Sequence, residues 1–460
     1  MEVSVQIDSN AGDKPRMSQT DDDGEDIISN FPESIISRIL SLLPTKDALR
    51  TCVLSKNWEY KWTSIYNIVI DDSKRFSLKT TRRKSVVYFV NRIFILSHTS
   101  RLKRFHLAFQ QEYDACRIMT WISAALMRNV EDLLIVYDYG GVVVPRCLFD
   151  CIPLTKLKLQ LPCVFRPVQN WFSNLKVLRL GKVEILNDHN SQLIFNFPVL
   201  ETLELRDCKW LKVNFVEVKA PALTELKVIH YSDLPEVENC YIKITGAKLL
   251  EIGFHRYFVE KFDLSSSSVF SAAIGYEGFQ DDLQVIRKNG LQARLLLKGC
   301  SGLNHLQLSG DTVEAIAQSN QGTPLPNFNM LKRLEISTKC NSEAFLEFLH
   351  STPYLQWIKL NMWMWNDYDY DLVESMPCCI VSHLKEVEFR GFKGEKPHVH
   401  LADFLLKNAV ELKKMTGLSR KKSDERRAEK NFWARLKGLV RDFDFQVGSS
   451  MKNMADFFES

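Results

Sequence analysis

Two histidines have a spacing that could hold a metal ion. His398 and His400 are two residues apart beside Pro397, which on a strand would place both imidazoles on one face. No third type of ligand is clustered near them in the sequence. We therefore interpret the pair as part of a surface loop and predict no metal site.

The cysteines offer equally little to a catalytic reaction. The chain has 11 of them, an odd and scattered number without a CxxC pair. Cys147, Cys151, Cys378 and Cys379 lack the basic or histidine neighbour that would mark a thiolate nucleophile. No GxSxG, GxxxxGK, GxGxxG or HExxH pattern is present either. These absences favour a binding protein, with no enzyme activity and no cofactor.

Composition narrows the class of protein further. Hydrophobic residues make up 45% of 460 residues, and the net charge of +4 is small for this length. We therefore predict neither a nucleic-acid partner nor a membrane partner. The first residues lack the plan of a signal peptide, and scattered cysteines suit a reducing compartment. The prediction is a cytoplasmic or nuclear protein whose acidic residues 1–25 form a disordered arm.

Three short helices are predicted next, and they carry more apolar surface than so small a unit can bury. The stretch FPESIISRILSLLP, residues 31–44, has apolar residues three and four apart, with Pro32 in its first turn and Pro44 at its end. Thr45 could cap a second helix, and Ser55 a third that carries Trp58 and Trp62. Their apolar face either docks on the rest of the chain or meets a separate partner.

A resemblance favours the partner. Residues 26–62, DIISNFPESIISRILSLLPTKDALRTCVLSKNWEYKW, resemble the F-box of plant F-box proteins, with Phe31 where leucine is usual and Asn57 where arginine is common. The resemblance implies docking on the Skp-type adaptor of a cullin-RING ubiquitin ligase. Carried over by position, the docking residues would be Phe31, Pro32, Ile35, Ile36, Ile39, Leu43, Pro44, Leu49, Val53 and Trp58.

From residue 100 onward one six-residue pattern recurs. It consists of an apolar anchor, two variable residues, an apolar residue, one variable residue and a final apolar residue. LTKLKL from Leu154, LETLEL from Leu200 and LKRLEI from Leu331 are examples. Successive anchors lie about 21 to 29 residues apart, except for a gap of about two periods between Leu249 and Leu303. A weak copy at Val269 and a helical insertion around residues 282–297 could fill that gap. The recurrence predicts a leucine-rich-repeat solenoid.

In such a solenoid the final residues of each copy form a short strand, and the strands stack into one curved parallel sheet. The outward row of this sheet would display Lys156, Lys158, Val177, Arg179, Thr202, Glu204, Arg206, Glu225, Lys227, His305, Gln307, Arg333, Glu335, Trp357, Lys359, Glu386 and Glu388. This row is either a solvated face or a ligand surface. As target-binding candidates we take Lys156, Lys158, Arg179, Arg206, His305, Arg333, Trp357 and Lys359.

Trp357 is the strongest of these candidates, because a large aromatic on an exposed strand face is a plausible binding anchor. Trp363 and Trp365 follow it closely. They either pack under their loop or extend an aromatic patch around Trp357.

The last segment combines one more repeat strand with an amphipathic helix, whose apolar residues are Leu401, Phe404, Leu405, Ala409 and Leu412. Such a helix could cap the open end of the solenoid. VSHLKEVEFRGFKG and ADFLLKNAVELKKM also resemble the FBD module of plant F-box and leucine-rich-repeat proteins, although its usual closing strand is not recognisable after Met415.

The predicted fold is α/β, an N-terminal three-helix F-box followed by a leucine-rich-repeat solenoid with a C-terminal cap. Its parts are an arm (1–25), an F-box-like domain (26–70), a connecting helix (71–99), the repeats (100–374), an FBD-like end (375–417) and an unassigned tail (418–460). We predict a substrate receptor that binds the adaptor, and through it a cullin, and holds an unknown target protein on its repeats. The alternative is a leucine-rich-repeat scaffold or ligand sensor unrelated to ubiquitination.

Overall fold

The computed structural model describes most of the chain between its two ends. It describes residues 28, 30–72, 80–96, 101–167, 172–187, 191–230, 240–256, 261–264, 269–276, 283–300, 302–319, 325–362, 365, 368–370, 373, 375–392, 395–418 and 443–446. The predicted arm, Trp363 and most of the predicted tail lie outside these residues.

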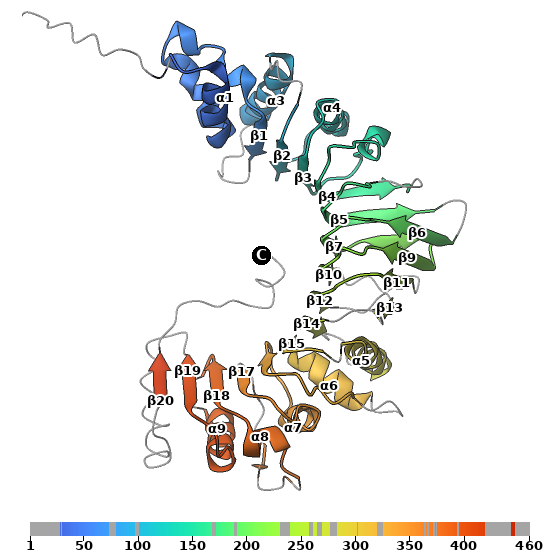
Figure 1. Ribbon diagram of the computed structural model, residues 1–460, viewed down its shortest axis with the longest axis vertical. Coiled ribbons are helices and arrows are strands. Elements are labelled where there is room, and N and C mark those ends of the chain that lie inside the picture. The colour runs from blue at the N-terminus through green and yellow to red at the C-terminus, as the bar shows by residue number, and fades with distance from the viewer. Residues whose placement is uncertain are drawn as a thin grey trace, which may run out of the picture.

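The fold is built on one long parallel sheet, which confirms the predicted solenoid (Figure 1). Sixteen strands of the described residues belong to it, counting β8 (Lys209–Leu211), which pairs with β5 beside the main path. Along the path the strands are β1 (Asn67–Asp71), β2 (Arg104–Phe109), β3 (Asp132–Tyr137), β4 (Lys156–Phe165), β5 (Val177–Leu186), β7 (Thr202–Arg206), β10 (Glu225–Ile229), β12 (Glu251–Arg256), β14 (Ser271–Tyr276), β15 (His305–Leu308), β16 (Arg333–Ile336), β17 (Trp357–Asn361), β18 (Glu386–Arg390), β19 (Lys414–Leu418) and β20 (Phe443–Gln446).

The outer layer of the arc changes along the chain. Figure 1 shows helices outside the sheet near both ends and a second, smaller sheet in the middle. This sheet has the order β13 (Lys261–Asp263), β11 (Tyr241–Thr245), β9 (Phe215–Lys219) and β6 (Gln192–Asn196). The helices are α3 (Thr80–Leu96), α4 (Ala115–Leu126), α5 (Leu283–Lys298), α6 (Gly310–Gln318), α7 (Ser342–Leu349), α8 (Cys378–Ser382) and α9 (Lys396–Asn408), with the 3₁₀ turn η4 (Arg146–Leu148).

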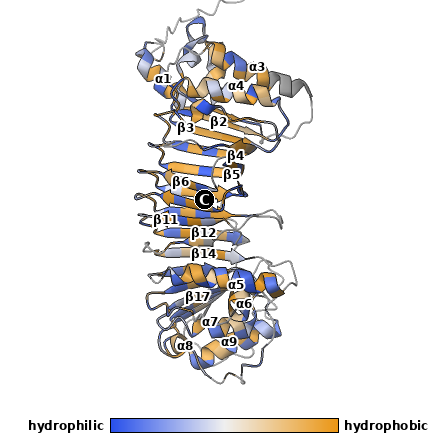
Figure 2. Ribbon diagram, turned by 90° about the vertical axis from the view of Figure 1, so that its right-hand side faces the viewer, coloured by the Kyte–Doolittle hydropathy of each residue, from blue (hydrophilic) through white to orange (hydrophobic). Residues whose placement is uncertain are grey.

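The repeat pattern explains the core between the two layers. In the copy from Leu154, the anchor and the two leucines of its strand, Leu157 and Leu159, are all buried. The strand residues between them face the inner side of the arc, and alternating apolar and polar positions are visible along many strands in Figure 2. No copy can enclose its own leucines, so each is covered by its neighbours.

The front of the chain folds as α1 (Glu33–Leu42), α2 (Thr45–Arg50) and three 3₁₀ turns, η1 (Thr51–Val53), η2 (Lys56–Trp58) and η3 (Lys61–Ser64). Two predicted details are wrong. Short 3₁₀ turns replace the third helix, and Ser55 makes no capping bond to them. Thr45 is a buried helical residue that accepts a hydrogen bond from the Val69 amide, 2.7 Å away, instead of capping α2.

The front module and the solenoid share a strand. β1 begins at Asn67, inside the predicted F-box-like domain, and pairs in parallel with β2. α1 and α2 therefore cover the outer edge of the sheet. An edge strand left open would present unpaired backbone groups to other chains.

The two-period gap contains both predicted elements. β14 follows Val269, and α5 occupies the expected insertion. α9 also forms where the amphipathic pattern lies, but β19 and β20 extend the sheet beyond it. The helix therefore lies between two repeat strands, and the sheet does not end at it.

Two smaller predictions concern single side chains. His398 and His400 lie in α9 and not in a surface loop, and His398 is buried. Trp365 packs inward and donates a 2.9 Å hydrogen bond from Nε1 to Ser342 Oγ, so it does not extend an aromatic patch. In the described part of the chain, no helix combines the length and the apolar character that a membrane crossing would require.

Candidate functional sites: an apolar helix face and the inner face of the sheet

Helix α1 carries apolar side chains on two faces. Ile36 and Leu40, each 1% exposed, pack into the chain's own core. Ile35 and Ile39, one helical turn apart, are 44% and 40% exposed. The helix thus binds the body with one face and leaves a second apolar face to solvent.

More exposed apolar residues lie just before and after α1 in the sequence. We call this set the front patch, and its members are Phe31, Ile35, Ile39, Leu42, Leu43, Val53 and Leu54, all exposed large apolar residues of the first helices and turns. A concentration of this kind on so short a segment is typical of an interaction site, because isolated apolar residues are what a monomer's surface normally shows.

Most of the predicted docking set lies on or beside this patch. Phe31, Pro32, Ile35, Ile39, Leu43, Pro44 and Val53 are exposed, and Leu49 is half-buried. Ile36 and Trp58 are buried, so neither offers its side chain to a partner in this conformation. Leu42 and Leu54 are exposed members that the prediction omitted. Their only signal in the sequence is that they extend the apolar run.

The predicted target-binding residues form two groups on the inner face. One lies on β4, β5 and β7, where Lys158, Arg179 and Glu204 stand at directly paired positions. Arg206 is two residues after Glu204 on the same face. These four side chains line one cavity of about 160 Å³. Lys156, on the same strand as Lys158, is exposed outside it.

Charges in this first group are coupled. Glu204 is buried, with its Oε2 3.3 Å from Arg179 Nε and its Oε1 2.9 Å from Arg206 Nη2. Burial lowers the pKa of Lys158, and the positive charge of Arg179 lowers it further. The carboxylates of Glu204 and Asp132 oppose this shift of the pKa without reversing it.

A second group lies on β15, β16 and β17, where His305, Arg333 and Trp357 stand at paired positions. The Arg333 guanidinium lies 5.8 Å from the centroid of the half-buried Trp357 ring, within the range of a cation–π contact. Lys359 is buried and forms an ion pair with Glu335, which makes it a structural residue. The structure therefore does not join the two groups into one site.

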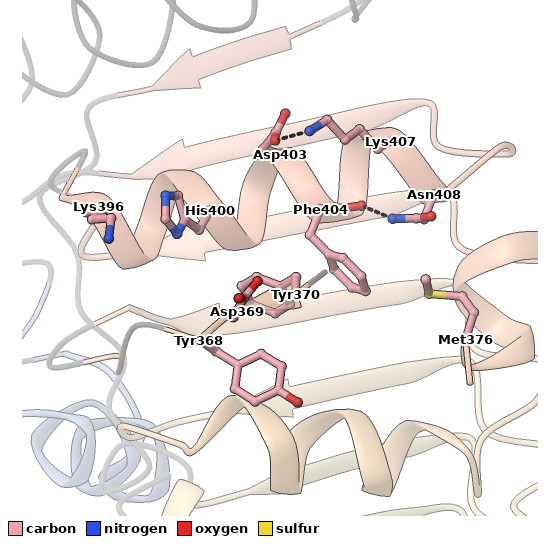
Figure 3. Close-up of a pocket in the computed structure, with 10 residues that line it drawn as sticks. All are labelled: Tyr368, Asp369, Tyr370, Met376, Lys396, His400, Asp403, Phe404, Lys407 and Asn408. Carbon is pink, nitrogen blue, oxygen red and sulfur yellow. Dashed lines mark hydrogen bonds and ion pairs between the residues drawn. The ribbon is translucent and has the colours of Figure 1, made fainter. Parts of the chain in front are cut away.

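A larger cavity lies on the outer layer near the C-terminal end. It has a volume of about 690 Å³ between α9 and the segment before α8, and Figure 3 shows ten of its residues. Tyr370 stacks on Phe404 with 4.7 Å between ring centroids, and Lys407 pairs with Asp403 at 2.7 Å. The lining contains no nucleophile with an adjacent base, and part of the segment beside it lies outside the described residues.

No group of three or more histidine, cysteine, aspartate or glutamate side chains in the described residues could hold a metal ion. Burial raises the pKa of the thiols of Cys163 and Cys300 to about 12, which leaves both protonated at neutral pH. These thiols are packed in the core and are not poised as nucleophiles.

Comparison with known proteins also separates a helical front module from the repeats. The model of the "At1g61320/AtMIF1, LRR domain" family matches residues 95–435, and the F-box domain model matches residues 28–69. One similar protein is the Arabidopsis thaliana "F-box/FBD/LRR-repeat protein At1g51370", 26% identical over 403 residues, which cover 85% of this chain and 88% of the relative. Another is the "FBD-associated F-box protein At1g66310" of the same plant, 28% identical over 440 residues, covering 90% and 95%.

The matched segments coincide with the structural ones. The F-box match contains α1, α2 and the front patch up to β1, and the other match covers the repeats from β2 to β19. The chain therefore belongs to the At1g61320/AtMIF1 leucine-rich-repeat family and carries an F-box domain at its N-terminal end.

Proposed function

We propose that this protein is the substrate receptor of a Skp–cullin–F-box ubiquitin ligase. The F-box binds a Skp-type adaptor, and the inner face of the sheet holds a target protein. The observation that carries the proposal is the front patch, an apolar surface that lies in the F-box domain and remains exposed after the chain has folded. Covering that patch is the contribution that an adaptor would make.

The receptor has no reacting residue of its own in this proposal. The adaptor connects it to a cullin, and target lysines react because they are held at a high effective concentration near the ubiquitin-charged enzyme. The inner face of the sheet is the natural place for the target, because a solenoid presents a long, continuous concave surface. The protein would act in the cytoplasm or nucleus, where cullin ligases operate.

We also propose that the C-terminal repeats form an FBD module. The F-box relatives carry this module in their names. Its resemblance here covers β18, α9 and the beginning of β19. β20 pairs in parallel with β19 and would supply the closing strand that the sequence did not reveal.

The test of adaptor binding uses two substitutions in the front patch. Ile35→Asp and Ile39→Asp each place a charge on the exposed face of α1, where neither residue contributes to the buried core. Each should weaken binding of a purified Skp-type adaptor by about tenfold or more, because a charge would be buried at the interface. Co-purification with the adaptor and titration calorimetry measure the effect.

The matched control is Ile152→Asp. Ile152 is also an exposed isoleucine, at 71%, but it lies in the repeats between η4 and β4, outside the F-box match. This variant should bind the adaptor like the wild type. Failure of the wild type to bind, or equal binding by all four proteins, would refute the receptor proposal. Ile36→Asp is not a suitable variant, since it would place a charge in the chain's own core.

The scaffold alternative has one observation in its favour, since the helices do cap the sheet through β1. Deletion of residues 26–70 cannot separate the two functions, because it removes β1 and would destabilise the repeats under either one. The front-patch substitutions can separate the two functions. If the helices only cap the sheet, the exposed face of α1 binds no adaptor and the substitutions change no adaptor binding.

A further inference from the structure

The cluster of Lys158, Arg179, Glu204 and Arg206 contains more positive charge than its own carboxylate can balance. Three cations and one anion give it a formal charge of +2. Both oxygens of Glu204 are engaged, one by Arg179 and the other by Arg206. Among the described residues, the Lys158 ammonium forms no ion pair or hydrogen bond.

Arg179 is also incompletely satisfied. Its Nε atom is buried and makes no hydrogen bond within the described residues. Glu204 Oε2 lies 3.3 Å away, but not in the geometry of a hydrogen bond. A buried N–H without an acceptor costs free energy, which a ligand oxygen could recover.

A second cluster on the same face shows that the excess charge is not a general property of this sheet. Glu335, Lys359 and Glu388 stand at paired positions on β16, β17 and β18, and Arg390 follows Glu388 by two residues, as Arg206 follows Glu204. Lys359 pairs with Glu335, and Arg390 with Glu388 at 2.8 Å. This cluster is neutral and has no cation left over.

The charged cluster lines a small hollow, which the backbone of Gly181 also lines. Gly181 lies between Gln160 and Arg206 in the strand register, and an added Cβ would be only 3.2 Å from Gln160 Cγ. The hollow of about 160 Å³ is smaller than the roughly 300–1,000 Å³ of sites that enclose whole small molecules. It has room for one functional group of a larger ligand.

Acidic side chains follow in the next strands. Glu225 and Glu251 stand opposite each other on β10 and β12. Glu225 pairs with the buried Lys227 at 3.0 Å, so Glu251 is the carboxylate of this pair that a ligand cation would meet. Burial raises the pKa of Glu251, and the neighbouring Glu225 raises it further. A continuous polyanion such as a nucleic-acid strand would be repelled there, whereas a basic group on the ligand would be attracted.

We propose that Lys158, Arg179 and Arg206 bind a single oxyanion, a carboxylate or phosphate group, carried by a peptide segment of the target. A basic residue of the same segment meets Glu251 on β12. Neighbouring strands are about 4.8 Å apart, so β5 and β12 are separated by roughly 14 Å, which an extended chain covers in about four residues. The inference rests on the proposed function, since it names the class of target that the receptor would hold.

The experiment uses the full chain and an array of nine-residue peptides of mixed sequence. The central residue is phosphoserine, glutamate or glutamine. Each peptide is made in two versions, one with a lysine four residues from the central residue and one without a lysine. The expected result is binding of the phosphoserine or glutamate peptides about tenfold stronger than glutamine peptides, with a further gain from the lysine. Comparison of the phosphoserine and glutamate arms identifies which oxyanion the cluster prefers.

Lys158→Gln is the decisive variant, because this side chain supports no ion pair of the fold and its loss should leave the protein intact. It should remove most of the preference for the oxyanion peptides. Lys158→Glu should reverse the preference toward peptides with a central lysine. Arg390→Gln is the matched control, because it removes a similar cation from the neutral cluster, and it should preserve the preference.

Adaptor binding is measured on the same samples. If the adaptor binds but glutamine peptides bind as well as the others, if no peptide binds, or if Lys158→Gln keeps the preference, the inference is wrong and the receptor proposal stands. Binding of a single-stranded oligonucleotide in place of peptides would also overturn it. Oxyanion-selective binding without adaptor binding would support this peptide site and refute the receptor proposal.

Discussion

Thr45 and Val69 connect the two parts of the molecule through a hydrogen bond of 2.7 Å, donated by the Val69 amide to the Thr45 hydroxyl oxygen. Ser41 accepts a second bond, 3.1 Å long, from the Tyr66 amide. Both acceptors are buried, and both donors lie at the start of the sheet, in or just before β1. The helices thus satisfy backbone groups on the side of β1 that faces away from β2.

Substitution of Thr45 by valine tests this connection. Valine keeps the volume but removes the acceptor of the Val69 amide from a part-buried position, at a cost of roughly 1–2 kcal/mol. Hydrogen exchange of the peptide that contains β1 should therefore accelerate by about tenfold or more. Thr120→Val is the control, because Thr120 is exposed and bonds only within α4. Equal exchange in both variants would show that the bond does not hold the module to the sheet.

Gly290 lies where the backbones of α5 and α6 come close together. A Cβ added to Gly290 would lie 2.0 Å from the carbonyl oxygen of Ala315, a backbone atom that cannot move without shifting its helix. Gly290→Ala should destabilise the protein by roughly 1–3 kcal/mol or more despite the better helix propensity of alanine. Thermal unfolding measures the change. Gly140→Ala, which meets nothing within 4 Å, should leave the Tm nearly unchanged, and a similar Tm for the two variants would contradict the packing described.

His305 makes the stability of the sheet depend on pH. Burial is the main cause that lowers its pKa, and Arg333 and Lys359 lower it further against the opposing effect of Glu335. The unfolded chain therefore binds a proton more readily than the folded one, and the contribution of His305 is lost as pH falls from neutrality through the pKa of the folded state. Urea unfolding at pH 7.5 and 5.0 should show a smaller loss of stability in His305→Gln than in the wild type. An equal loss would exclude His305 as a source.

Thiol reactivity provides a check on the core. Cys116, Cys147 and Cys378 are exposed, whereas Cys163 and Cys300 are buried with pKa values raised to about 12. An aromatic disulfide reagent at pH 8 should label the exposed three in the native protein and the buried two only after unfolding. Mass spectrometry identifies the labelled peptides. Rapid labelling of Cys163 or Cys300 in the native protein would contradict the burial described.

The repeat architecture could be predicted because every copy must bury the same apolar positions against its neighbours. Leu154, Leu157 and Leu159 recur as a pattern wherever a repeat must cover its neighbours, and the spacing of the anchors then gives the sheet. The positions of α5 and β14 followed from a gap in that spacing. The turns of the front module did not follow, because its short helical segments are selected by packing against β1 and not by local propensity.

The sequence did not reveal which individual side chains of a helix or strand are buried and which are exposed. Ile35 and Ile36 have the same chemistry and adjacent positions, but only the packing of α1 decides which of them enters the core. Glu204 and Lys359 likewise belong to the outward row, yet neighbouring charged side chains bury them. Such lateral contacts join residues from different repeats, so no single repeat contains the information.

Hydrogen exchange of the full chain, with and without a Skp-type adaptor, decides whether the F-box is the docking surface, because it locates the contact on the intact protein. The adaptor should slow exchange in residues 31–54, which include α1, α2 and the front patch, and leave exchange in the strands β4 to β18 unchanged. Protection of those strands with an unchanged α1, or no protection anywhere at saturating adaptor, would contradict docking through the F-box.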